Sequence, residues 1–225
     1  MQHMPHKKLP ITKKRLSTGV KGLDRLLGGG VEVGAVTEIV GEYGTGKTQL
    51  CHQLAVMAKL EGVGRVLYLD ADGTFRPERI VSIAEARGLG PEEALENIYV
   101  VRVDEWPQLL FLREKIDKYA LVVLDSLPTI FIAPRNIREA RKFKGRIALL
   151  ANELLKRAIE KSIAVILVNI EYRGNVFAEH YLSPFVNKVI KLIKEREELS
   201  AKVIPLGDRT KLTITEEGVR EIAEN

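Results

Sequence analysis

The stretch Gly41-Glu42-Tyr43-Gly44-Thr45-Gly46-Lys47-Thr48 decides the fold, because it matches the phosphate-binding pattern Gly-x-x-x-x-Gly-Lys-Ser/Thr. The apolar run at 36–40 before it predicts a buried strand, and residues 49–60 after it predict a helix. Glycines let the backbone form a cradle of N–H donors at a helix N-terminus, where an anion is favoured. We therefore expect a nucleoside triphosphate to bind along this loop as far as Gln49, with Lys47 on the β- and γ-phosphates and Thr48 on Mg²⁺.

The rest of the chain alternates apolar strands with helices. Strands are predicted at 65–70, 98–103, 121–125 and 164–169, and helices at 77–87, 91–97, 108–119 and 146–161. Three further strands, at 188–193, 201–205 and 211–215, read as a final antiparallel group. This order predicts an α/β fold: a mainly parallel twisted sheet, helices on both faces and a C-terminal antiparallel extension.

Composition predicts one globular domain. The chain has 225 residues, of which 45% are hydrophobic and 29% charged, and no apolar run is long enough to cross a membrane. The single cysteine, Cys51, is expected in the core, and a cytoplasmic location follows from the lack of a signal peptide pattern. Residues 1–23 hold six basic residues and no acid, so we expect 1–15 to form a flexible basic arm before a domain at 16–225.

Polar residues follow several predicted strands, at the sheet edge where ligands of such folds bind. Asp125 ends the apolar run Leu-Val-Val-Leu and reads as a Walker B carboxylate that holds the Mg²⁺ shell. Asp72, after the strand at 65–70, is the candidate general base for a water, with a turn-forming role as the alternative. Arg76 and Arg79 either stack on a purine ring or are ordinary surface charges.

Several stretches resemble the family of archaeal RadA and the eukaryotic recombinases. They are LSTGVKGLDRLLGGG at 16–30, GEYGTGKTQL at 41–50, TFRPERI at 74–80, LDSL at 124–127 and TITEEG at 213–218. The resemblance implies a RecA-like P-loop NTPase core that binds ATP and Mg²⁺ and acts on DNA in recombination and repair. It also implies that Lys47 and Thr48 contact phosphate and Mg²⁺, and that Arg76 or Arg79 lies near the adenine.

The chain departs from that family pattern at the positions used for hydrolysis and assembly. Asp72 stands where the family carries Glu, and Ile170 follows Asn169 where the family has a Gln that senses the γ-phosphate; whether Glu171 replaces that Gln is open. A shift of about 1 Å in a catalytic group can cost about 10²-fold in rate. No Phe-x-x-Ala subunit-linking peptide occurs, the second DNA-binding loop is short, and the N-terminal DNA-binding domain of RadA is expected to be missing. These features are similar to those of RadA paralogues such as RadB.

The first DNA-binding loop of the family would fall between residues 127 and 145, where Arg135, Arg138, Arg141 and Lys142 form a basic run. Arginines three residues apart share one face of a helix, and phosphate contacts by such a row weaken with salt. The alternative is a solvated charged face. Four aromatic residues could stack on bases, although packing is the favoured interpretation: Trp106, Tyr172, Phe177 and Tyr181.

Three functions remain open on this sequence. The first is a RadA paralogue that binds ATP, hydrolyses it slowly with DNA as a stimulant, and mediates or regulates recombination, with single-stranded DNA and a RadA recombinase as expected partners. The second is a recombinase that forms filaments and exchanges strands, and the third is a P-loop kinase or nucleotide switch unrelated to DNA.

Overall fold

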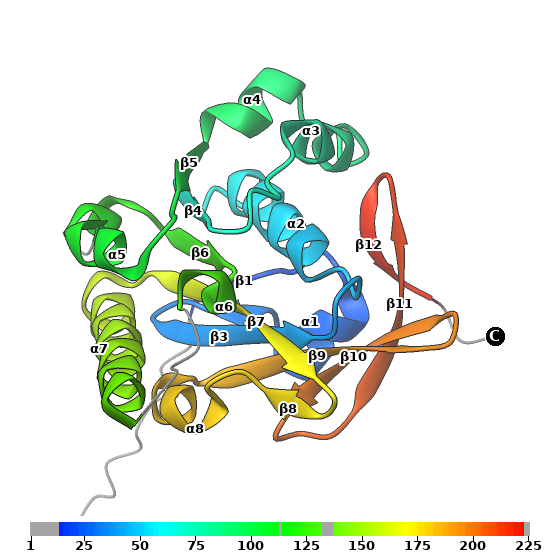
Figure 1. Ribbon diagram of the computed structural model, residues 1–225. Helices are drawn as coiled ribbons and strands as arrows, with labels where there is room; N and C mark the ends of the chain where they lie inside the picture. Colours follow the sequence, from blue (N-terminus) through cyan, green and yellow to red (C-terminus); the bar gives the residue numbers. More distant parts are fainter. Residues whose placement is uncertain (1–13, 113, 132–136, 223–225) are drawn as a thin grey trace, which may run out of the picture.

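The computed structural model describes residues 14–112, 114–131 and 137–222. One large twisted sheet forms the centre of the molecule, with strands in the order β12-β11-β10-β9-β3-β7-β6-β4-β5 and β8 paired to β7 (Figure 1). The strands from β9 to β5 are parallel to one another, and β10, β11 and β12 add an antiparallel group beyond β9. The α/β fold class predicted from the sequence is confirmed.

The strands have the following bounds: β1 Arg15–Leu16, β2 Val31–Glu32, β3 Ala35–Gly41, β4 Val66–Asp70, β5 Ile98–Arg102, β6 Leu121–Asp125, β7 Ala164–Tyr172, β8 Asn175–Val176, β9 Lys188–Glu195, β10 Glu198–Ile204, β11 Arg209–Thr215 and β12 Gly218–Glu221. The helices are α1 Lys21–Leu27, α2 Lys47–Leu60, α3 Pro77–Glu85, α4 Pro91–Glu96, α5 Trp106–Leu112, α6 Leu127–Ile130, α7 Ile137–Lys161 and α8 Glu179–Leu182, with 3₁₀ turns η1 Lys115–Lys118 and η2 Ser183–Phe185.

Alternation along the central strands divides the core into two layers. Successive side chains of a strand point to opposite faces, and both faces of the parallel strands are buried. On one face Val66, Tyr68, Leu121 and Val123 pack with α1, α2, α3 and α4. On the other face the intervening residues of the same strands pack with α5 and α7. Figure 1 shows these two groups of helices on either side of the sheet.

Two predicted helices differ from the structure by more than two residues. The predicted helix at 108–119 is divided into α5 and the 3₁₀ turn η1, where Asp117 forms ion pairs with Arg157 (2.9 Å) and Lys161 (3.3 Å) of α7. The predicted helix at 146–161 begins nine residues earlier, at Ile137. It runs through Gly145, beside which a Cβ would meet nothing, so the residue costs only its local backbone entropy of roughly 1 kcal/mol.

Short paired strands were not predicted. β1 pairs with β2 in a separate two-stranded sheet, so Arg15, at the end of the predicted basic arm, lies in a strand. β7 continues three residues past its predicted end and turns through Arg173 and Gly174, both at positive φ, into β8. The second DNA-binding loop, expected between Ile170 and about Asn187, therefore starts with a tight hairpin.

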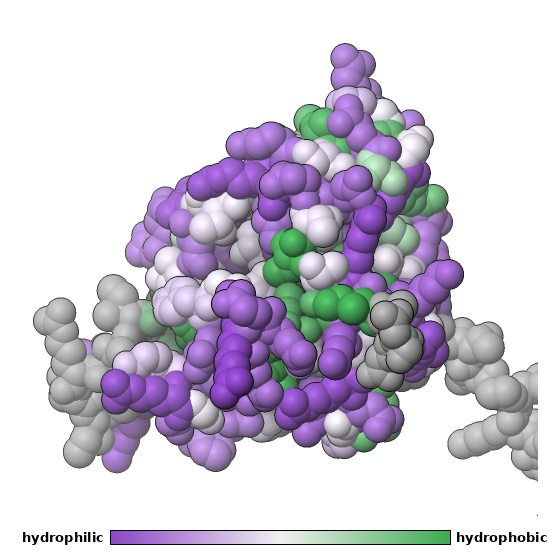
Figure 2. Space-filling model, turned by 90° about the vertical axis from the view of Figure 1, so that its right-hand side faces the viewer, coloured by the Kyte–Doolittle hydropathy of each residue, from purple (hydrophilic) through white to green (hydrophobic). Residues whose placement is uncertain are grey.

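The outer surface near the C-terminal strands is mostly hydrophilic. Figure 2, which shows the right-hand side of Figure 1, has a compact apolar area near its centre with polar side chains around it. Among the described residues, no helix is long and apolar enough to span a bilayer.

Candidate functional site

The loop between β3 and α2 requires glycine at several positions. Gly44 and Gly46 have φ of +75° and +85°, and Gly46 is the N-cap of α2. A Cβ on Gly46 would lie 2.2 Å from Cδ1 of Ile214, and one on Gly41 would lie 2.6 Å from the carbonyl oxygen of Leu192. The loop is thus packed closely against β9 and β11, with the N-terminus of a 14-residue helix directly behind it.

Lys47 lies folded along this loop. Its ammonium group donates hydrogen bonds to the carbonyl oxygens of Gly41 (3.0 Å) and Glu42 (2.8 Å). Burial lowers the pKa of Lys47, and the nearby carboxylates of Asp125 and Asp72 oppose that shift. The ammonium group of Lys47 is therefore held by two neutral carbonyl oxygens. A bound phosphate could take their place and form stronger, charge-assisted hydrogen bonds with it.

Asp125 ends β6 and is almost fully buried. Its Oδ2 accepts a 2.6 Å hydrogen bond from the hydroxyl of Tyr68, and its Oδ1 is buried with no hydrogen-bond partner among the described residues. Burial raises the pKa of Asp125; Tyr68 and Thr48 oppose the rise. A hydroxyl and a carboxylate with one unpartnered oxygen are hard oxygen donors of the kind that Mg²⁺ takes beside substrate phosphates, so Thr48 and Asp125 fit the expected metal.

These groups open onto one cleft of ≈ 400 Å³. The cleft is lined by Tyr43, Gly44, Gly46, Lys47, Thr48, Gln49, Asp72, Thr74, Asp125, Ser126, Pro128, Thr129, Val168, Asn169, Ile170 and Ile214. The structure thus brings together most of the loop residues predicted from the sequence, both predicted carboxylates and the position after Asn169.

Asp72 is exposed at the rim of the cleft and is held there by two hydroxyl groups. Ser126 Oγ donates to its Oδ2 at 2.9 Å, and Thr129 Oγ1 donates to its Oδ1. The turn that carries Asp72 is fixed by Asp70, whose carboxylate accepts hydrogen bonds from the backbone N–H groups of Gly73 (2.8 Å), Thr74 (3.1 Å) and Phe75 (3.3 Å). The turn-forming role, which was the alternative for Asp72, is thus filled by Asp70.

Asn169 is the one residue of β7 with a side-chain amide, and this amide is hydrogen-bonded within the protein. The Asn169 side chain donates to Glu38 Oε1 (2.6 Å) and to the carbonyl oxygen of Phe177 (2.8 Å), and Ile170 lines the cleft with a side chain that forms no hydrogen bonds. Glu171 accepts a 2.7 Å hydrogen bond from Lys191 and lines a separate groove beside β9. Glu171 is therefore occupied away from the cleft.

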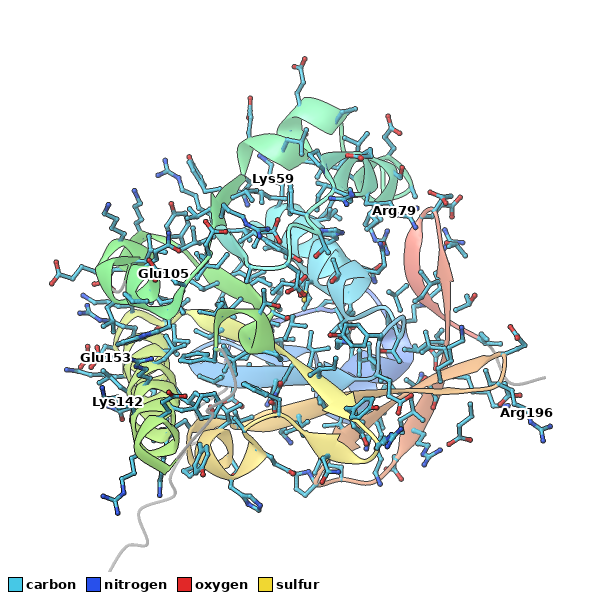
Figure 3. The ribbon with its side chains drawn as sticks, viewed as in Figure 1. Lys59, Arg79, Glu105, Lys142, Glu153 and Arg196 are labelled. Atoms are coloured by element: carbon cyan, nitrogen blue, oxygen red, sulfur yellow. The ribbon has the colours of Figure 1, made fainter. Side chains whose placement is uncertain are left out.

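The two arginines predicted near adenine are engaged by the protein itself. Arg76 donates to the carbonyl oxygens of Gly73 (3.1 Å) and Phe75 (2.9 Å), and Arg79 forms an ion pair with Glu216 in the turn after β11. Figure 3 shows Arg79 between α3 and the β11–β12 hairpin. Neither residue lines the cleft, and contact with a base stays a prediction.

A model of the Rad51 family matches residues 12–184 of the chain. The chain belongs to the Rad51 family. Because the match covers more than half of the sequence, it assigns a RecA-like core and a role in DNA recombination and repair to the same fold that the strand order shows. Members of the Rad51 family generally bind ATP with Mg²⁺, which agrees with the donors found in the cleft.

The basic run expected to contact DNA in a Rad51 family member lies at the start of α7. Arg141 and Lys142 are exposed on this helix, and Figure 3 shows Lys142 on the side away from the sheet. Arg138 lies in the first turn of the helix, and Arg135 lies outside the described residues. The region between 127 and 145, expected to be a DNA-binding loop, is helical from Ile137 onward.

Most aromatic side chains near α7 pack against the protein. Arg146 stacks over Trp106 at 5.0 Å, Lys144 lies over Tyr181 at 5.5 Å, and Phe177 packs edge to face on Phe143. Tyr172, at the β7–β8 hairpin, is 62% exposed, with the guanidinium of its neighbour Arg173 5.2 Å from the ring centroid.

Sequence reasoning missed several residues of the site. Tyr68, Ser126 and Thr129 hold the two carboxylates, and Ile214 arrives from β11, far along the chain. Strand alternation could have indicated Tyr68, because it lies two positions before Asp70 on the strand next to β6. The hydroxyls of Ser126 and Thr129 follow Asp125 directly, but their partner could be identified only from the fold.

Proposed function

We propose that this Rad51 family protein binds ATP with Mg²⁺, hydrolyses it slowly, and acts as a mediator or regulator in homologous recombination and DNA repair. In this proposal it is a paralogue of RadA in the cytoplasm of an archaeal cell and has a RadA recombinase as a partner. The observation that carries the proposal is a contrast within one cleft. The residues proposed to bind phosphate and metal line it together, whereas those at the positions proposed to drive hydrolysis are short, apolar or already hydrogen-bonded.

Binding is supported by the glycine cradle, by Lys47 and by the donor pair Thr48 and Asp125. The dipole of α2 and the N–H groups of its first turn add to the positive potential at the same point. The nearby oxygens of Asp125 and Thr48 would hold the metal, which, when bound, would neutralise phosphate charge. The cleft volume of ≈ 400 Å³ lies within the usual range for small-molecule sites.

Slow hydrolysis is supported by Asp72 and Ile170. Asp72 has the shorter acidic side chain, and both of its oxygens already accept hydrogen bonds from Ser126 and Thr129. A carboxylate that is set back and hydrogen-bonded is a weaker general base for a water. Ile170 cannot donate to the terminal phosphate, so an interaction that would strengthen as charge develops is missing.

DNA binding is supported by the exposed basic residues at the start of α7 and by Tyr172 on the neighbouring hairpin. Contacts of Arg141 and Lys142 with phosphates would be insensitive to base sequence. They would weaken as salt is added, because counterions released from the DNA on binding gain less entropy in a more concentrated salt solution. An exposed tyrosine favours single-stranded DNA, whose bases are free to stack.

The test is the steady-state rate of ATP hydrolysis, measured alone and with single- or double-stranded DNA, together with the mass of the protein in solution. We expect a turnover well below about 1 s⁻¹, the lower end for ordinary enzymes, that rises on addition of DNA. A turnover above that value in the absence of DNA would contradict the proposal.

A filament-forming recombinase is the second candidate, and the family match favours it over phosphotransfer to a small molecule. Electron microscopy of the protein with ATP and single-stranded DNA separates it from the first. Regular helical filaments of this protein alone would favour strand exchange, and their absence together with binding to DNA would favour the mediator.

A further inference from the structure

Tyr68 is a fully buried tyrosine whose hydroxyl ends at the carboxylate of Asp125. The bond from Tyr68 Oη to Asp125 Oδ2 is 2.6 Å long, and the tyrosine side chain is 0% exposed. A buried hydroxyl without a partner costs free energy, so this contact also satisfies the polar end of Tyr68.

Strand register explains why the two residues meet. β4 and β6 are parallel neighbours in which Tyr68 stands beside Val123 and Asp70 stands beside Asp125. Because alternate residues share a face, Tyr68 and Asp125 lie on the same face, two positions apart along the strands. A tyrosine side chain is long enough to span that diagonal, which the shorter apolar residues of these strands cannot do.

The ring of Tyr68 is held in place by its neighbours. Its centroid lies 4.9 Å from that of Phe75, on the turn that follows Asp72, and 5.6 Å from that of His52 on α2. With the ring confined between these two elements and the hydroxyl on Oδ2, the carboxylate of Asp125 is oriented. Oδ1 is then the oxygen without a partner.

We propose that Tyr68 is a positioning residue for the metal-binding carboxylate. It occupies Oδ2 of Asp125 and leaves Oδ1 for the Mg²⁺ shell of the bound nucleotide. This inference rests on the proposed function, because it assumes that Asp125 contributes to Mg²⁺ binding. A neutral phenol suits the task, since it donates a hydrogen bond without bringing a positive charge that would compete with Mg²⁺.

The experiment is Tyr68→Phe, with Tyr99→Phe as the matched control. Tyr99 is a tyrosine on the neighbouring strand β5 that is 42% exposed. Binding of a fluorescent adenine nucleotide is titrated first with EDTA and then with increasing Mg²⁺. We expect Tyr68→Phe to bind nucleotide like the wild type in EDTA and to need about 10–100-fold more Mg²⁺ for the metal-dependent gain, the usual effect of losing a group behind a metal ligand.

The outcomes are separable. Wild-type protein that binds no nucleotide under either condition overturns the proposed function itself. Normal binding by the wild type with an unchanged Mg²⁺ midpoint in Tyr68→Phe overturns the positioning role alone. A Tyr68→Phe protein that no longer folds, judged by circular dichroism, also contradicts it, because the hydroxyl would then serve stability.

Discussion

Asp72 has a carboxylate whose two oxygens are both occupied by hydroxyls from the segment after β6. Removing one hydroxyl frees one carboxylate oxygen to accept a hydrogen bond from the attacking water. We predict that Thr129→Val, which keeps the side-chain shape, increases the ATP turnover roughly three- to tenfold, the equivalent of one hydrogen bond of about 1 kcal/mol. The measurement is the steady-state rate at saturating Mg·ATP.

The control for this prediction is the same change in an Asp72→Ala protein, where no carboxylate remains to be released. Thr129→Val is expected to leave the residual rate of that protein unchanged. If Thr129→Val raises the ATP turnover both with Asp72 present and with Asp72→Ala, Thr129 acts by another route. If it raises the turnover in neither protein, Asp72 is not the general base.

His52 is a buried imidazole on α2 that has no hydrogen-bond partner on either ring nitrogen among the described residues. Burial, the largest cause, lowers its pKa from 6.5 to about 4. Between these values the unfolded chain takes up a proton that the folded protein does not, so the free energy of unfolding falls as the pH falls. From pH 7 to pH 5 this histidine alone should remove about 2 kcal/mol of stability.

We predict that His52→Phe, which preserves an aromatic ring beside Tyr68 and Phe75, makes the free energy of unfolding less dependent on pH between pH 7 and pH 5. Urea denaturation at pH 7, 6 and 5 measures it. The carboxyls with raised pKa, Glu38 and Asp125, remain in both proteins, so the difference between variant and wild type isolates the imidazole. A parallel pH dependence in the two proteins would contradict the burial argument.

At the scale of the element, α7 carries the proposed DNA contacts at its first turns and ordinary surface charges further on. Lys142 and Lys156 are both exposed lysines of this helix. We predict that Lys142→Ala lowers the affinity for DNA and reduces the slope of log affinity against log salt by about 0.7 for single strands or 0.9 for duplex. Fluorescence anisotropy at several salt concentrations measures both quantities.

Lys156→Ala removes the same charge from the same helix and is the matched control, with an unchanged slope expected. Equal effects of the two substitutions would mean that only the net charge of the protein matters. Such a result would remove the assignment of DNA contacts to the start of α7.

The elements that could be predicted from the sequence are those whose own residues determine them. The strands at 36–40, 65–70 and 121–125 are apolar runs buried on both faces, and α2 follows a loop whose glycines define its start. The break between α5 and η1 and the pairing of β1 with β2 depend on partners farther along the chain, so local patterns do not contain them. β8 and β12 pair with the strand directly before them, but at two and four residues they are too short to give a clear apolar pattern.

The residues of the candidate site also fall into those that could be predicted from the sequence and those that could not. Lys47, Thr48 and Asp125 were predictable because motifs and strand ends specify them directly. Tyr68, Thr129 and Ile214 enter through sheet register and through packing of the C-terminal strands, which one sequence without the fold does not specify.

At the scale of the whole molecule, Gln53 joins the two ends of the described chain to the helix behind the phosphate-binding loop. Its amide donates to the carbonyl oxygens of Thr18 (2.8 Å) and Val219 (3.0 Å), and its oxygen accepts from the N–H of Val219 (2.8 Å). Removing it leaves three buried backbone groups without these partners.

We predict that Gln53→Ala lowers the free energy of unfolding by about 2–4 kcal/mol, because buried unsatisfied groups cost about 1–3 kcal/mol each and some will find water. Chemical denaturation measures the change. Gln108→Ala, in the first turn of α5, is the control. Its side-chain oxygen accepts from the exposed N–H groups of Asp104 (2.7 Å) and Glu105 (3.2 Å), which water can replace, so it is expected to cost only about 1 kcal/mol. Similar losses in the two variants would show that Gln53 does not tie the chain together.

The central claim is that this cleft holds ATP firmly and cleaves it slowly. The most direct measurement mixes radiolabelled Mg·ATP with excess protein and follows the bound and the cleaved fractions in the same samples, for the wild type and for Lys47→Ala. The account predicts rapid binding by the wild type, cleavage more slowly than about 1 s⁻¹, and little binding by Lys47→Ala. Nucleotide that stays unbound by the wild type, binds equally to Lys47→Ala, or is cleaved as fast as it binds would contradict it.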